Sequence, residues 1–434
     1  MSKPFAAASW MRVPVLLAAF SAGASSGQPN DRRMPSADQA SVGSRFDPEA
    51  ATRSYLAKLA PDQKARSDAY FEGGYWLTLW SFLYAAPILV LLLVTGWSAR
   101  LRGWAEQRVR FRPIQTIIYW AGYSVVTTVL VFPLTVYRRF FREHVYGLSN
   151  QTFGAWLGDF AKEFVVALIF GAILIPFLYG AVRRIGQSWW IWGTAISIVF
   201  LAFYLLVYPV AIAPLFNKYT RITDERIRNP ILRMARANGI EAQEIYQVDA
   251  SRQSKRISAN VSGFLGTQRI SLNDNLLTRT SLPEIQAVMG HEMGHYMLNH
   301  VEKALMFYAL YFAAAFGWVN WAFHQAHRRW GEKWGVRGIG DTAGFPLALL
   351  VGMIFSFVTS PLVRSFVRVQ EYEADIFGLN AARQPDGFAE VTLKLSEYRK
   401  LDPGPLEEWI FYDHPSGRVR IYTAMRWKAE NMLQ

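Results

Sequence analysis

Residues 291–295 read His-Glu-Met-Gly-His, a group of side chains that could hold and use a metal ion. Each residue of a helix advances by about 100°, so residues four apart share a face. His291 and His295 are such a pair and could bind one ion together. Glu292 lies one step round the helix, where it can reach a water on that ion without binding the ion itself. This HExxH pattern is typical of zinc-dependent hydrolases, in which the glutamate is the general base.

The third histidine nearby, His300, does not share the helix face of His291 and His295. It is five residues past His295, so on a continuous helix it lies about 140° away from the face that the pair shares. We therefore predict that His300 is a polar residue at the helix end or a group behind the ligands. Catalytic zinc takes three protein ligands and keeps one position open. Since the chain has no cysteine, the missing ligand must be a histidine or a carboxylate.

An acidic segment at 370–375, Gln-Glu-Tyr-Glu-Ala-Asp, offers the missing ligand. If this segment is helical, Glu371 and Asp375 share a face and Glu373 points away. Glu371 is then predicted to bind the metal, with Asp375 behind it as the acceptor for the N–H of a ligand histidine. The alternative is a solvated acidic helix start, which adds a little stability through the helix dipole. Beside the HExxH pattern, we prefer the ligand interpretation.

The HExxH residues lie on a predicted helix with a well-marked start. Ser281 is the N-cap, Glu284 completes a capping box three residues later, and Pro283 lies in the first turn. The polar stretch before this helix predicts one further helix, two strands, and one segment that is either a loop or an edge strand. In chain order these are the helix at 223–239, the strand at 244–251, the undecided segment at 256–266 and the strand at 267–274.

Long apolar runs fill much of the remaining chain, which is 52% hydrophobic and only 18% charged. Soluble domains carry about 25% charged residues, and a membrane-spanning helix needs about 20 apolar residues. Six runs without charges are near or above that length: 73–99, 113–137, 164–182, 185–217, 304–323 and 342–363. Buried core helices are the alternative interpretation, but six such runs with aromatic ends indicate transmembrane helices.

The spans and motifs divide the chain into six parts. We predict a signal peptide or an N-terminal anchor at 1–27, a polar lead-in at 28–72, a membrane domain with four spans at 73–217, a first catalytic part with the HExxH helix at 218–303, a transmembrane hairpin at 304–363 and a second catalytic part at 364–434. The hairpin splits the polar half of the chain. Either two small domains sit apart, or the two halves fold together on one face, because a hairpin starts and ends on the same side.

The net charge of +13 has a topological explanation. Many lysines and arginines lie in short loops, and no pattern of aromatic and basic residues suited to bases is visible, so nucleic-acid binding is not predicted. Loops 98–112, 183–188 and 325–341 hold eleven of these residues on one side, against four in loop 138–163 on the other. The positive-inside rule then places the metal site outside the cytoplasm. A cleaved bacterial-type signal agrees and favours the periplasmic side of a bacterial inner membrane, whereas an uncleaved anchor fits the opposite orientation.

These motifs, in this order, resemble a known family. "HEMGH", two membrane spans, "EYEAD" and then "DHPSGRVRI" look like the membrane gluzincin metalloprotease family of the type I CAAX prenyl endopeptidases and their bacterial homologues. The heat-shock membrane protease is a more distant relative. The resemblance runs from about Asp47 to the C-terminus, and "RSDAYFEGGYW" looks like the start of the family's membrane domain. Each motif alone is weak, but their combination is highly specific.

The resemblance implies a fold and a set of site residues. The fold is mostly α-helical, with six or seven transmembrane helices in a chambered barrel and a zincin-like domain with a small β-sheet. One Zn²⁺ per chain would lie near one end of the chamber. The implied roles are metal ligand for His291, His295 and Glu371, general base and acid for Glu292, acidic partner for Asp375, substrate contact for Asn260 in "SANVSG", oxyanion donor for His414, and an ordering role for Arg420.

The resulting prediction is a zinc-dependent endopeptidase of the membrane. It would cleave membrane-associated, lipid-modified or misfolded proteins, so its partners would be a peptide or protein substrate and the lipid bilayer. A non-catalytic membrane chaperone or lipid-handling protein with a structural metal is the alternative. A structural zinc site is closed by a fourth protein ligand, however, and would leave Glu292 without a task. A transporter would carry ionisable residues in mid-span, and the six runs have none.

Overall fold

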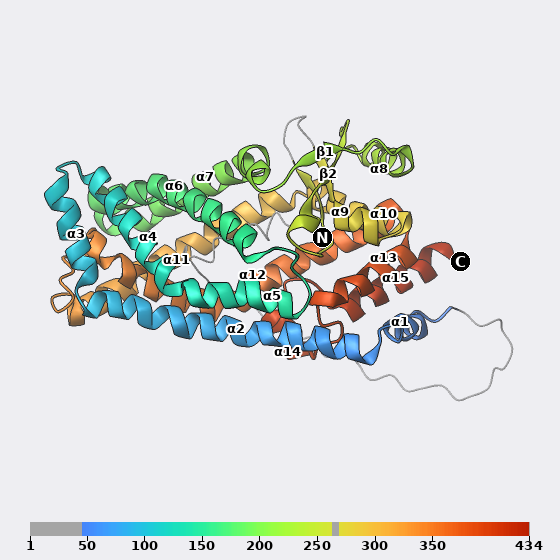
Figure 1. Ribbon diagram of the computed structural model, residues 1–434, viewed down its shortest axis with the longest axis horizontal. Helices are drawn as coiled ribbons and strands as arrows, with labels where there is room; N and C mark the ends of the chain where they lie inside the picture. Colours follow the sequence, from blue (N-terminus) through green and yellow to red (C-terminus); the bar gives the residue numbers. More distant parts are fainter. Residues whose placement is uncertain (1–45, 263–268, 434) are drawn as a thin grey trace.

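Long helices give the protein its elongated shape (Figure 1). The computed structural model describes residues 46–262 and 269–433, and six long helices of these residues lie side by side along the longest axis. The long helices are α2 (Pro61–Val94), α4 (Arg112–Val136), α6 (Phe153–Ile185), α7 (Trp189–Val207), α11 (His300–Trp330) and α12 (Phe345–Ala382). The segment at 1–27, predicted to be a signal peptide or an anchor, lies outside the described residues.

The apolar runs lie in these helices. Within the described part of the chain, five stretches are long and apolar enough to cross a membrane, and one of them, Phe153–Leu215, contains both α6 and α7. This stretch folds back on itself at Gly186, which has φ 68°, and Phe170 of α6 packs edge-to-face on Phe200 of α7 with ring centroids 5.5 Å apart. The six predicted runs are therefore confirmed as parts of six separate helices. Large apolar side chains such as Val199 and Leu310 remain exposed, as contact with lipid requires.

A small mixed sheet lies at one end of the long helices, together with the described residues of the polar stretches 218–303 and 364–434 (Figure 1). We call this end of the molecule the polar end. Its strands are β1 (Tyr219–Arg221), β2 (Ile245–Val248), β3 (Ala259–Ser262) and β4 (Arg269–Asn273) in the order β1-β2-β4-β3. Only β2 and β4 are parallel; the other two pairs are antiparallel. The undecided segment thus contains an edge strand, β3. Helix α8 (Glu225–Ala237) covers the sheet because its buried Ile231 and Ala235 join the core cluster that contains Ile270.

The helix that carries HExxH, α10 (Leu282–Met297), starts as predicted. The backbone N–H of Ser281 donates to Glu284 Oε2 at 2.6 Å, and Pro283 lies in the first turn. The acidic segment 370–375 is helical, as predicted, and is continuous with the last span, because α12 extends without a break from Phe345 in the membrane region to Ala382. One helix therefore joins the membrane hairpin to the second half of the site.

Helices α10 and α12 approach each other through glycines. A Cβ on Gly290 would lie 2.8 Å from the carbonyl oxygen of Gly378, and one on Gly378 would lie 2.6 Å from the backbone nitrogen of His291. One on Gly294 would lie 3.0 Å from Cα of Ala374. Only residues without a side chain allow the two backbones to come this close. Of the two arrangements left open by the sequence, the structure has the second: the two polar halves fold together.

The remaining helices complete the polar end and the opposite end. At the polar end lie α1 (Pro48–Leu56), α5 (Arg142–Val145), α9 (Asp274–Arg279), α13 (Pro385–Lys394), α14 (Pro405–Phe411) and α15 (Gly417–Met432), and at the opposite end lies α3 (Trp97–Arg108). Helix α15 packs through Ile421 and Ala424 into a second buried cluster that α13 shares. Short π-helical and 3₁₀ segments join several of the long helices.

Candidate metal centre

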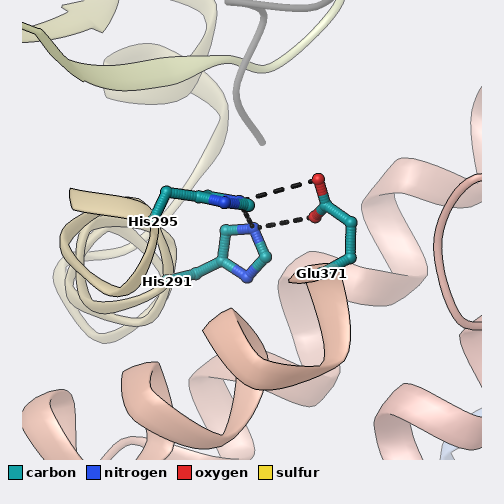
Figure 2. A group of neighbouring side chains, drawn as sticks. All are labelled: His291, His295 and Glu371. Carbon is teal, nitrogen blue, oxygen red and sulfur yellow. Dashed lines mark hydrogen bonds and ion pairs between the residues drawn. The ribbon is translucent and has the colours of Figure 1, made fainter. Parts of the chain in front are cut away.

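Three predicted ligands meet at the contact between α10 and α12. One donor atom from each of His291, His295 and Glu371 lies within 4.8 Å of the others. The two histidine Nε2 atoms are 3.1 Å apart, and Glu371 Oε2 lies 3.1 Å from Nε2 of His291. Figure 2 shows both rings of α10 and the carboxylate of α12 pointing at one another. The structure thus brings together three residues that are up to 80 positions apart in the sequence.

The donor set fits a cation. His291 Nδ1 lies 2.7 Å from Asp375 Oδ1, which can only accept, so the proton of this ring is on Nδ1 and Nε2 offers a lone pair. That lone pair faces Glu371 Oε2, a buried oxygen that makes no hydrogen bond within the described residues. Burial lowers the pKa of His291, but Asp375 and Glu371 outweigh burial and raise this pKa above its ordinary value. The negative potential that produces this shift also attracts a divalent cation, and imidazole with carboxylate suits zinc.

Asp375 connects the centre to α15. Arg420 donates from Nε to Asp375 Oδ2 at 2.8 Å and from Nη2 to Oδ1 at 2.5 Å. Both side chains are buried, with exposed fractions of 1% for Asp375 and 5% for Arg420. Such a two-point contact fixes the plane of the carboxylate. Asp375 and Arg420 therefore lie behind His291, where the resemblance places an acidic partner and an ordering arginine.

Glu292 lies on α10, and Asn260 lies on β3, the strand that packs against α10. Glu292 follows His291 on α10 and is 2% exposed, so its carboxylate is enclosed beside the three predicted ligands. Asn260 is on the edge strand β3, and its Oδ1 is buried without a hydrogen-bond partner in the described part of the chain. Among the described residues β3 is an edge strand of the sheet, a position at which strands can pair with a further extended segment.

His414 reaches the centre from the segment between α14 and α15. Its Nε2 lies 3.1 Å from Glu371 Oε2, and its Nδ1 lies 2.7 Å from Asp413 Oδ1. Arg399 Nη2 lies 3.3 Å from the same Nε2. Burial lowers the pKa of His414, and the positive charge of Arg399 lowers it further. Neither Asp413 nor Arg399 was predicted from the sequence, although Asp413 is next to the histidine in "DHPSG".

Two arginines of α12 hold this segment in place. Arg368 donates from Nη1 to the carbonyl oxygen of Tyr412 at 2.7 Å, two residues before His414. Arg364, one turn earlier on α12, donates to the carbonyl oxygen of Ile410 at 2.7 Å. The helix that presents Glu371 therefore also fixes the backbone that presents His414.

The place of His300 corrects an assumption of the sequence analysis. The 140° displacement assumed one continuous helix, but α10 ends at Met297 and α11 begins at His300, with Asn299 in the left-handed region at φ 54° between them. His300 turns back and its Nδ1 lies 2.8 Å from Nδ1 of His295. It is thus outside the cluster of three predicted ligands and directly behind one of them, which agrees with the second of the two roles predicted for it. Asparagine adopts this backbone conformation more readily than most residues. The asparagine in "LNH" at 298–300 is therefore the feature of the sequence that could have indicated the break between the two helices.

Comparisons with known proteins agree with this arrangement. Two family models match consecutive parts of the chain: the N-terminal part of CAAX prenyl proteases, described by five membrane helices, at 50–218, and peptidase family M48 at 221–428. The uncharacterized metalloprotease YhfN of Bacillus subtilis (strain 168) is 28% identical over 339 residues, which cover 78% of this chain and 79% of that protein.

Eukaryotic relatives and one solved structure are also similar. CAAX prenyl protease 1 of Saccharomyces cerevisiae is 26% identical and covers 74% of this chain and 75% of its own length. The human CAAX prenyl protease 1 homolog is 25% identical and covers 78% of this chain and 81% of its own length. The crystal structure of S. mikatae Ste24p has a TM-score of 0.71 at 20% identity and covers 87% of this chain and 95% of its own. At that identity, the last match demonstrates a shared fold.

Proposed function

Because this chain belongs to peptidase family M48 and carries the membrane domain of the CAAX prenyl proteases, we propose that it is a zinc-dependent endopeptidase of the gluzincin type. Membership confirms the resemblance seen in the motifs, and the chain is an integral membrane metalloprotease. The convergence of three side chains supports the proposal that the metal is zinc and the site is of the gluzincin type. His291, His295 and Glu371 offer three donors of the kinds that catalytic zinc uses. The chaperone alternative is not favoured, because the matched relatives are named as proteases.

The residues around the proposed metal have separate tasks. A bound zinc ion would act as a Lewis acid and lower the pKa of water to about 7. Glu292 takes the proton of the attacking water and passes it to the leaving amine, and its buried position keeps that carboxylate out of bulk solvent. Asp375 and Arg420 hold the ring of His291 so that Nε2 faces the centre.

His414 and Arg399 are proposed to stabilise the negative oxygen that develops on the substrate carbonyl. Nδ1 of His414 already donates to Asp413, so Nε2 can also donate only when the ring is doubly protonated. Asp413 favours that form, whereas burial and Arg399 disfavour it. Arg399 lies beside the same nitrogen, keeps its charge at every relevant pH, and can supply the same stabilisation.

A large cavity between the membrane helices supports a lipid-bearing or apolar substrate. Its volume is about 660 Å³, and most of its lining surface is apolar, with Phe170, Leu201 and Phe316 among the lining residues. At its polar end it reaches Ser254 and Arg256, in the segment that leads into β3. We infer that a peptide adds to β3 as an extra strand while an attached lipid or an apolar segment enters the cavity. The relatives named as prenyl proteases make a prenylated peptide the first substrate to test.

The positions of the basic loops also indicate which end of the protein faces the cytoplasm. We infer that the protein lies in a bacterial inner membrane with the metal centre on the periplasmic side, because the basic loops gather at the other end. Arg183 of one such loop donates to the carbonyl oxygen of Gly340 in another at 2.8 Å, and Arg337 donates to Glu106 Oε1 at 2.7 Å. Loop 138–163 instead contacts the sheet region, where Asn150 N–H donates to the carbonyl oxygen of Gln253 at 3.1 Å. The positive-inside rule then assigns the basic end to the cytoplasm.

Substitution of the proposed base tests the function. Glu292→Gln keeps the size of the side chain and removes its ability to take a proton, so zinc content should stay at about one ion per chain while cleavage is lost. The measurement pairs metal analysis of the purified protein with cleavage of a prenylated and a matching unprenylated peptide, each with and without a chelator. Glu302→Gln, an exposed position on the next helix, is the matched control. Normal cleavage by Glu292→Gln would reject the proposed mechanism.

A further inference from the structure

The ligand histidine His295 has a support on the side away from the metal centre. Its Nδ1 lies 2.8 Å from Nδ1 of His300, which is 4% exposed. Nε2 of His300 lies 3.1 Å from Glu373 Oε2. Lys303 Nζ donates to that same oxygen at 2.7 Å. Lys303, Glu373 and His300 thus form a chain of polar contacts that ends on His295.

The chemistry of these groups sets the direction of every hydrogen bond in the chain. A neutral histidine that offers Nε2 to a metal keeps its proton on Nδ1. His295 Nδ1–H would then donate to the lone pair of His300 Nδ1, which leaves the proton of His300 on Nε2. Nε2–H donates to Glu373, whose carboxylate can only accept. The charge on Glu373 therefore selects one tautomer for both rings, and Lys303 holds Glu373 in place.

The backbone places His300 for this role. The left-handed conformation of Asn299 reverses the chain between α10 and α11, so that His300 returns to the turn that carries His295. Gln370 Nε2 donates to the carbonyl oxygen of His300 at 3.2 Å. Gln370 is adjacent to the predicted ligand Glu371, and Glu373 is two residues further along α12. Residues close to Glu371 on α12 therefore hold His300 in place behind His295.

We propose that His300, Glu373 and Lys303 are positioning residues that hold the ring of His295 in the tautomer and orientation that a metal needs. The inference rests on the proposed zinc site. It gives His295 the kind of support that Asp375 and Arg420 give to His291: a histidine, a carboxylate and a cationic side chain in series. The support of His295 is longer by one imidazole and ends at the surface, where Glu373 and Lys303 are 40% and 41% exposed.

Zinc affinity of the purified protein, measured by competition with a chromophoric chelator, tests this inference without a substrate. His300→Leu removes the acceptor of His295 Nδ1–H, and zinc should bind about 10–100-fold more weakly, the usual cost of losing such a partner. His300→Asn keeps an amide oxygen near the position of Nδ1 and should recover most of the affinity. Glu373→Ala changes only a half-exposed side chain and should weaken zinc binding in the same direction, so it decides the question if His300→Leu fails to fold.

The visible spectrum of the protein loaded with Co²⁺ adds a readout of ligand geometry. It should change in His300→Leu and return towards the wild-type spectrum in His300→Asn. The matched control, Glu302→Gln, removes an exposed carboxylate next to Lys303 and should leave both affinity and spectrum unchanged. Wild-type affinity and spectrum in His300→Leu and Glu373→Ala would overturn the inference. Failure of the wild-type protein to bind zinc would instead overturn the proposed metal site.

Discussion

Single residues at the centre have consistent hydrogen-bonding preferences. The outer nitrogen of His291 contacts Asp375 and that of His295 contacts His300, so in each ring the inner nitrogen points towards Glu371. A carboxylate opposite two lone pairs is unfavourable unless a cation lies between them, either a metal ion or a proton on one of the rings. The three donors are of the kinds that zinc takes in catalytic sites, so the arrangement suits metal binding.

Loss of the contact between Asp375 and Arg420 should weaken zinc binding and destabilise the protein. Asp375→Asn keeps the shape of the side chain but removes the charge that holds His291 and Arg420. Zinc affinity should fall about 10–100-fold, and unfolding should cost roughly 3–5 kcal/mol less because a buried arginine loses its partner. Chelator competition and thermal unfolding in detergent measure the two effects. Asp402→Asn removes a similar carboxylate from Arg418 at the surface, where both groups are over 40% exposed, and equal losses in the two variants would contradict the prediction.

At the scale of elements, the centre depends on how closely α10 and α12 pack. Gly378→Ala would place a Cβ 2.6 Å from the backbone nitrogen of His291. The helices must then separate, at a cost of about 1–3 kcal/mol for overpacking. We expect a lower unfolding temperature together with weaker zinc binding, because the ligands lie on opposite sides of this contact. Within the described part of the chain, Gly317→Ala on α11 meets no atom within 4 Å and should leave both quantities unchanged. Weak zinc binding at unchanged stability would indicate a different cause.

Some features of the elements around the centre could be predicted from the sequence, because they depend only on residues close together in the chain. The start of α10 is local chemistry, since Ser281, Pro283 and Glu284 determine it within one turn. The pairing of His291 with His295 follows from helical periodicity alone. The end of α10 was not predicted, because it depends on Asn299 adopting φ 54°, a conformation that local sequence permits but does not require. The contact of His300 with Glu373 joins residues 73 positions apart, and only the tertiary packing of α11 on α12 brings them together.

The basic loops and the metal centre lie at opposite ends of the whole molecule. Helix α3 and the basic loops lie at one end of the long helices, and the sheet and the metal centre lie towards the other (Figure 1). Contacts between loop 138–163 and the sheet region, such as that of Lys255 N–H with the carbonyl oxygen of Leu148 at 3.1 Å, attach the polar end to the membrane helices. The two ends of the molecule therefore lie on opposite sides of the bilayer, and one measurement of sidedness orients all of it.

The absence of cysteine from the sequence makes that measurement direct, since any introduced thiol is unique. Glu430→Cys places a thiol on the exposed end of α15, and Lys333→Cys places one on the exposed basic loop at the other end. If the basic end faces the cytoplasm, a membrane-impermeant maleimide added to sealed cells should label Glu430→Cys at once and Lys333→Cys only after permeabilisation. The reverse pattern would contradict the periplasmic orientation and agree with an uncleaved N-terminal anchor. Both variants should retain normal zinc content, because neither position contacts the metal centre, and so the labelling reports topology alone.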